Sequence, residues 1–190
     1  MNREQWLTEV ANGLLPAFNA KGLFPKNFRI TCGWPCRNAL SVRRRCLGEC
    51  HSYKSSKAKI SEIFISPTMD EGASVGGVIS HELIHAAVGV DQGHKGLFVK
   101  ACRTLGMVGK PIHASPGPSL QRRIDAIIAS IGPYPHAALA GYARPPARST
   151  GQVRMYCPCG CKITISTKWL AEAGPPTCGC GMEMSVDKGE

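Results

Sequence analysis

The chain has 190 residues, of which 43% are hydrophobic, so it can form a packed core and is not expected to be disordered throughout. It contains no run of about 18 apolar residues, which argues against a membrane-spanning helix. Its first residues, MNREQWLTEV, lack the apolar stretch of a secretory signal. We therefore expect a cytoplasmic protein with no membrane partner.

The net charge of +10 is unevenly distributed along the chain. Residues 1–150 hold 19 Lys and Arg against 9 Asp and Glu, whereas residues 151–190 hold 4 of each kind. A positive surface attracts nucleic-acid phosphates, although the same charge also favours solubility. DNA is therefore a candidate partner of the first part of the chain.

Hydrophobic periodicity predicts an α+β fold, with a small sheet flanked by helices. Apolar residues at three- and four-residue spacing predict four helices, whereas alternating or short β-rich runs predict three strands. Pro16 is expected to weaken the end of the first helix, and Gly89 suits the end of the second. The helices are expected at residues 2–20, 73–88, 94–105 and 119–131, and the strands at residues 28–32, 46–52 and 60–65.

A change in composition predicts two domains. Residues 132–151 contain four prolines and three glycines, which is typical of a linker. Beyond them the chain is rich in Cys and Gly and has short β-like runs. We expect one domain at residues 1–150, which includes this linker, and a small second domain at residues 152–190.

The sequence His81-Glu82-Leu83-Ile84-His85 has the spacing of a metal site on the second predicted helix. Two histidines four residues apart lie on the same helix face, so both can bind one ion, and Glu82 beside them can reach a metal-bound water. Such a site, with three protein ligands and one open position, is typical of catalytic zinc. It predicts a zinc metallopeptidase in which Glu82 assists the attack of zinc-bound water on a peptide bond.

The third protein ligand of this zinc must come from another part of the chain. His94 is preferred, because Gly89 lets the helix end and the next helix is expected to begin near His94. Asp91 is the first alternative, followed by His113 and His136. The longer metzincin pattern is not met, because Asp91 stands where its third histidine would be. No helper for the tetrahedral intermediate stands out among Tyr134, His136 and His113.

Five of the ten cysteines fall in the last 40 residues. Without a secretory signal we interpret them as metal ligands rather than disulfides. Two short Cys-x-Cys pairs, each followed by glycine, predict the knuckles of a zinc ribbon, whose metal is structural. Cys178 and Cys180 form the second pair, whereas the first pair is Cys157 with either Cys159 or Cys161.

Four further cysteines are spaced as two pairs in the first half of the chain. Whether they bind a further metal is open from the sequence alone: Cys32, Cys36, Cys46 and Cys50.

The segment HELIHAAVG followed by GHKGLF resembles the SprT-like metallopeptidase family. The resemblance covers roughly residues 25–185, and short phage and prophage members also have segments like GECHS, IFISP and GPYPHAAL. It implies an upstream strand and a C-terminal zinc ribbon, with Glu82 as general base and three zinc ligands: His81, His85 and His94. Glycine follows the family's second ribbon cysteine as Gly160 follows Cys159, so the resemblance implies Cys157, Cys159, Cys178 and Cys180 as the structural ligands, with Cys161 as the alternate. Lys95 is a departure, since the family often has glycine there.

Members of this family cleave proteins crosslinked to DNA, so the resemblance implies a DNA-associated protein substrate, in the host cytoplasm if the chain is phage-encoded. One alternative is a non-proteolytic zinc- and nucleic-acid-binding protein, such as a phage DNA-transaction or transcription accessory factor. Another is an adaptor with two structural zinc sites. The ribbon and the positive charge favour the first of these alternatives, whereas the presence of Glu82 opposes it. Cleavage specificity and oligomeric state do not follow from the sequence.

Overall fold

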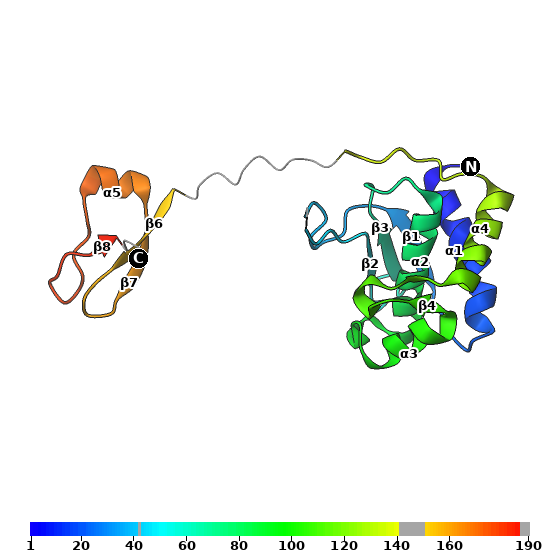
Figure 1. The fold of residues 1–190 in the computed structure, drawn as a ribbon. Coiled ribbons are helices and arrows are strands. Elements are labelled where there is room, and N and C mark those ends of the chain that lie inside the picture. Colours follow the sequence, from blue (N-terminus) through cyan, green and yellow to red (C-terminus); the bar gives the residue numbers. More distant parts are fainter. Residues whose placement is uncertain (42, 141–150, 187–190) are drawn as a thin grey trace. The chain divides into compact units, whose positions relative to one another are not determined.

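The computed structural model describes residues 1–41, 43–140 and 151–186, which belong to two units, Met1–Tyr142 and Ala143–Glu190. The first unit combines helices with two small sheets and the second combines a short helix with one small sheet, so the described residues have the predicted mixed α+β class (Figure 1). None of the described helices has the length and hydropathy needed to span a bilayer. The boundary predicted near residue 150 falls next to residues 141–150, which lie outside the described residues.

The first unit contains a three-stranded sheet formed by β1 (Phe28–Cys32), β2 (Gly48–His51) and β3 (Ser61–Ile65). The strand order is β1-β3-β2, in which β1 runs parallel to β3 and β2 runs antiparallel to it. The strand β2 therefore lies at one edge of this sheet.

The two faces of the sheet differ in burial because side chains alternate along each strand. Ile63 in the central strand is buried and pairs with Cys50, so Cys50 and Gly48 face the core with it. Glu49 and His51, the alternate residues of β2, face the opposite side. This alternation separates two groups of polar residues discussed below.

Among the described residues, four helices complete the first unit, and the second of them, α2 (Gly72–Val88), contacts the other three as well as the sheet (Figure 1). The helix α1 packs on β1, and α2 packs on β2 and β3. A two-stranded hairpin of β4 (Met107–Val108) and β5 (Ser115–Pro116) joins the last two helices. The helices are α1 (Arg3–Asn19), α2 (Gly72–Val88), α3 (Gly96–Leu105) and α4 (Pro118–Ile131), with 3-10 turns at Val90–Gln92 and Pro111–His113.

Apolar side chains at helical spacing form the core, as the periodicity predicts. Pro16 does not end α1, which continues to Asn19. The third predicted helix begins two residues later than expected, at Gly96, so His94 precedes it. The largest fully buried side chains of the first unit are Trp6, Phe18, Phe98, Leu7, Leu14, Ile63, Ile65, Ile79, Leu83, Ile84 and Ile124.

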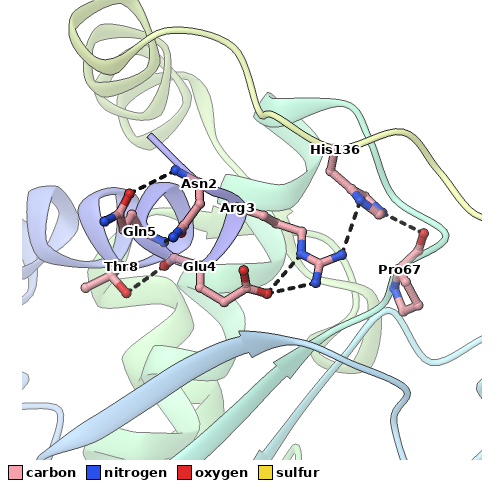
Figure 2. Close-up of polar contacts among 7 residues, drawn as sticks. All are labelled: Asn2, Arg3, Glu4, Gln5, Thr8, Pro67 and His136. Atoms are coloured by element: carbon pink, nitrogen blue, oxygen red, sulfur yellow. Dashed lines mark hydrogen bonds and ion pairs between the residues drawn. The ribbon is translucent and has the colours of Figure 1, made fainter.

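The first part of the predicted linker, residues 132–140, packs against the first unit instead. Tyr134 is only 7% exposed. His136 Nε2 lies 2.9 Å from the carbonyl oxygen of Pro67, and its Nδ1 lies 3.5 Å from Arg3 Nη1 (Figure 2). The proline and glycine content does suit an extended chain, but aromatic and histidine side chains anchor that chain to the core.

The second unit is a small antiparallel sheet with one short helix. Its strands are β6 (Gln152–Tyr156), β7 (Lys162–Ser166) and β8 (Ser185–Val186), in the order β7-β6-β8, and α5 spans Thr167–Ala173. Its buried apolar cluster among the described residues consists of Met155, Cys157 and Met184. A core of this size gives little hydrophobic stabilisation, so a unit of this kind depends on further cross-links or a metal.

The N-terminus of α2 is capped by a glutamate, which predicts a pH-dependent contribution to stability. The Glu71 carboxylate accepts hydrogen bonds from the N–H groups of Ala73 at 2.9 Å and Ser74 at 2.6 Å. A hydrogen bond from the Ser74 side chain, together with these backbone hydrogen bonds, holds the pKa of Glu71 below its usual value. Replacing it by Ala should lower the free energy of unfolding of the first unit by about 1 kcal/mol at pH 7.

The carboxylate form of Glu71 is the one favoured by folding. Its contribution is therefore present above the unfolded pKa of about 4.3 and is lost as the pH falls through the lowered folded value. Urea unfolding of wild type and Glu71→Ala should give a difference at pH 7 that is smaller at pH 3. The exposed Glu9→Ala on α1 is the control. A difference that is the same at both pH values would contradict the carboxylate cap.

Candidate metal centres

Three histidines converge in the first unit. His81 and His85 lie one turn apart on α2, and His94 lies in the connection that precedes α3. The Nε2 atoms of His81 and His94 are 3.0 Å apart, and those of His85 and His94 are 3.4 Å apart. The structure thus brings together the preferred three residues, whereas Asp91 is exposed and lies 3.5 Å from Lys54 Nζ.

Two glycines allow His94 to reach the other histidines. Gly89 ends α2 with φ of 97°, and Gly93 has φ of 51°, values that favour glycine over other residues. The chain makes a 3-10 turn between them and returns towards α2. This reversal, rather than the start of α3, places His94 beside His81.

Phe98 holds all three histidines in place. It is fully buried in α3, and its ring centroid lies 4.2 Å from that of His85, 4.9 Å from that of His81 and 5.0 Å from that of His94. The spacing of the metal ligands does not point to Phe98. The available signal was its position four residues after His94, in the first turn of the following helix.

The donor atoms of this group fit a zinc ion. Nitrogens bound to a tetrahedral zinc lie about 3.3 Å apart, which is close to the two separations found here. Burial lowers the pKa of His81 to about 4 and that of His85 to about 3, and the neighbouring histidines add to both shifts. The imidazoles are therefore neutral at pH 7, the form that binds metals. A shared proton would satisfy one nitrogen–nitrogen contact, whereas a cation satisfies all of them.

Glu82 is a buried carboxyl group beside these ligands on α2. It is 5% exposed, and none of the ion pairs among the described residues involves it. Burial raises the pKa of Glu82 to about 8, and the negative charge of Glu49 adds to the rise, whereas a backbone hydrogen bond from Cys50 opposes it. A raised carboxyl pKa of this kind is typical of groups that exchange protons at neutral pH.

Gly48 leaves the space that the Glu82 side chain occupies. A Cβ atom added at Gly48 would clash with Val78 and would lie 2.8 Å from Glu82 Oε1. Gly48→Ala should therefore displace Glu82 while leaving the histidine group intact. If Glu82 is the general base, displacement on the order of 1 Å would lower kcat on the order of 100-fold.

The Gly48→Ala prediction requires kcat and bound zinc to be measured together. The matched control is Gly72→Ala on α2, where the added Cβ would meet its nearest neighbour, Trp6, at an ordinary 3.4 Å. If kcat is unchanged in Gly48→Ala, or falls equally in Gly48→Ala and Gly72→Ala, activity does not require the space that Gly48 leaves for the Glu82 side chain.

The three candidate helper residues differ in position. The charge of His113 contributes to lowering the pKa values of His81 and His94, so His113 lies near the histidine group. Tyr134 packs on Trp6 with ring centroids 4.7 Å apart, and His136 contacts Pro67. Among the three, His113 is therefore the one that the structure associates with the histidines.

Four cysteines converge in the second unit. The Sγ atoms of Cys157 and Cys180 are 3.4 Å apart, and those of Cys159 and Cys178 are 3.6 Å apart. These separations exceed a disulfide bond and approach the distance of about 3.8 Å expected between sulfurs on a tetrahedral zinc. Cys161, the alternate ligand, lies outside this group.

Matching turns bring the four sulfurs together. Gly160 N–H donates to the Cys157 carbonyl at 2.9 Å, and Gly181 N–H donates to the Cys178 carbonyl at 2.8 Å. Both glycines have positive φ, 92° and 85°. A backbone hydrogen bond at Cys161, together with hydrogen bonds to the neighbouring thiols, lowers the pKa of Cys159 to about 6. A thiol with a lowered pKa is readily available as the thiolate, the form that binds metals.

The four cysteines of the first unit do not form the four-cysteine site considered above. Cys32 is buried beside Tyr134, and Cys46 Sγ donates to the Gly48 carbonyl at 2.9 Å. Burial raises the pKa of Cys50 to about 12. Cys36 is exposed and lies beside residues of a different kind, which are described below.

Comparisons with protein-family models, with curated proteins and with solved structures found no match to this chain. Its function must therefore be inferred from the two ligand groups and the residues around them.

Proposed function

We propose that the protein is a zinc-dependent metallopeptidase of the SprT-like kind. In this proposal His81, His85 and His94 hold a catalytic zinc, Glu82 is the general base, and the four cysteines hold a structural zinc in a ribbon. The observation that best supports it is the buried Glu82 carboxyl, which lies between two convergent histidines of α2 and has no ion-pair partner among the described residues.

The proposed chemistry depends on proton movement at Glu82. A zinc ion at the three histidines would supply a Lewis acid that makes water more acidic and polarises a peptide carbonyl. A Glu82 carboxylate oxygen would take the proton from the attacking water and later return it to the leaving amine. Burial keeps this carboxyl in a medium of low polarity, which raises its pKa to about 8 and so makes the carboxylate a stronger base.

Burial of Glu82 also discriminates between an enzyme and a binding protein. A buried carboxyl without an ion-pair partner has a desolvation cost, and a purely structural histidine site would gain nothing from it. The non-proteolytic alternative is favoured by the positive charge and the cysteine group, but it gives Glu82 no role.

The proposed substrates are proteins associated with DNA. The net charge of +10 lies within residues 1–150, so the part of the chain that includes the histidine group is the one that attracts phosphates. A cationic enzyme is repelled by free basic proteins but attracted to the same proteins on DNA. We therefore expect DNA to increase the cleavage of bound proteins, and we expect this effect to weaken as salt rises.

The test is proteolysis of a DNA-binding protein by the zinc-loaded chain, with and without DNA, beside casein as a substrate without DNA affinity. We expect DNA to accelerate cleavage of the bound protein but not of casein. Equal acceleration in both cases, or none, would contradict the DNA-associated substrate. No cleavage of either protein, together with DNA binding, would contradict the peptidase and favour the binding protein.

A further inference from the structure

A third group of metal-binding side chains lies on the outer face of the sheet. Glu49 and His51 are alternate residues of β2, on the face opposite Gly48 and Cys50. Cys36 comes from the connection between β1 and β2, residues 33–47. These three side chains are distinct from the histidine group and from the second unit.

One atom from each side chain converges on a common point. Cys36 Sγ lies 3.7 Å from His51 Nε2, and Glu49 Oε2 lies 3.6 Å from the same nitrogen. Atoms bound to a tetrahedral zinc are separated by about 3.6 Å for a sulfur–nitrogen pair and about 3.3 Å for a nitrogen–oxygen pair. The three ligand atoms all lie within 4.8 Å of one another.

The use of a single imidazole nitrogen argues against a nucleophilic cysteine. In a catalytic triad the histidine contacts the nucleophile with one nitrogen and the carboxylate with the other. Here Cys36 and Glu49 both lie at Nε2 of His51. That arrangement suits three donors around one cation and does not suit a proton relay.

The carboxylate is also held in position by the chain that provides the cysteine. The backbone N–H of Cys36 donates to Glu49 Oε2. Hydrogen bonds of this kind orient metal ligands in their sites. The side chains of Glu49 and His51 are 22% and 33% exposed, so an ion can reach them from solvent.

We propose that Cys36, Glu49 and His51 bind a third transition-metal ion, with zinc as the native occupant. A set of sulfur, nitrogen and oxygen donors favours Zn²⁺ over Mg²⁺ or Ca²⁺, which prefer oxygen. The ion ties the start of the 33–47 connection to the edge strand β2. The other face of that strand carries Gly48, against which Glu82 packs.

Metal content of the full chain tests this proposal without reference to activity. We would load the protein with Zn²⁺, remove weakly bound ions by gel filtration and measure zinc per chain by mass spectrometry. Cys36→Ser and His51→Ala should each bind one zinc fewer than wild type. Glu62→Gln, which alters a carboxyl on the adjacent strand β3, is the control and should retain the wild-type content.

Cys46→Ser distinguishes the proposed ligands from the alternative site formed by Cys32, Cys36, Cys46 and Cys50. Unchanged zinc in Cys46→Ser, together with the loss in Cys36→Ser, supports the proposed site. Loss of one zinc in both Cys36→Ser and Cys46→Ser would favour a site formed by the cysteines of the first unit and would overturn the proposal. Wild-type zinc content in both Cys36→Ser and His51→Ala would also overturn it.

Limited trypsin digestion gives a second measurement. The 33–47 connection contains Arg43, Arg44 and Arg45, so its restraint by the ion should protect these sites. We expect zinc-loaded Cys36→Ser to be cleaved at these arginines faster than zinc-loaded wild type. Wild type treated with a chelator should also be cleaved there faster than zinc-loaded wild type. Equal cleavage rates in all three samples would contradict the proposal that the ion restrains the 33–47 connection.

Discussion

Replacing Glu82 by Gln is expected to lower kcat by about 100- to 10,000-fold while leaving bound zinc unchanged. The amide has nearly the same size as the carboxyl, so the space against Gly48 stays filled. It cannot accept the proton of the attacking water, which is the role proposed for Glu82. The measurements are kcat on an unfolded protein substrate and zinc per chain for both proteins.

Glu62→Gln makes the same chemical change on β3, where the carboxyl pairs with Arg29 at 2.7 Å on the surface. It should retain wild-type kcat. Equal activity of wild type and Glu82→Gln would remove the general base from the mechanism. An equal loss in both variants would show that the effect of Glu82→Gln is not specific to the site.

Cys178→Ser is expected to unfold the second unit and leave the first unit folded. The second unit has three buried apolar residues among those described, which is too few to keep it folded without its metal. Loss of one sulfur removes a ligand from the four-cysteine group, and zinc sites of this kind stabilise the fold through metal binding. Amide resonances of residues 151–186 should lose their dispersion, while those of the first unit persist.

Cys161→Ser is the matched control for this experiment, because Cys161 is also a ribbon cysteine but lies outside the four-sulfur group. It should keep both the folded spectrum and the zinc of the second unit. If Cys161→Ser unfolds the second unit and Cys178→Ser leaves it folded, Cys161 is a zinc ligand and Cys178 is not. Retention of the folded spectrum by metal-free wild type would contradict a structural zinc.

Local patterns predicted most of the first unit. The short β-rich run FRITC and the alternating run ISEIFI predicted strands that the structure has at β1 and β3, because one face of each must enter the core. Helical spacing predicted α2 to within one residue of its start. The contacts of residues 132–140 were not predicted, because composition does not report where Tyr134 and His136 find partners.

Some candidate sites follow from local sequence patterns, whereas others depend on how distant segments pack. The histidine pair on α2 and the two cysteine turns are local, so their spacing suffices to identify them. The group of Cys36, Glu49 and His51 depends on a 13-residue separation and on the register of β2, neither of which the spacing of ligands reveals. The contact between Gly48 and Glu82 is likewise a product of packing between β2 and α2.

The position of zinc in crystals of the zinc-loaded protein tests the proposed catalytic centre most directly. Anomalous scattering at the zinc edge should show an ion about 2.1 Å from the Nε2 atoms of His81, His85 and His94. The four-cysteine group provides an internal reference for occupancy in the same crystal. Density for zinc at the cysteines with none at the three histidines would contradict the proposed catalytic centre.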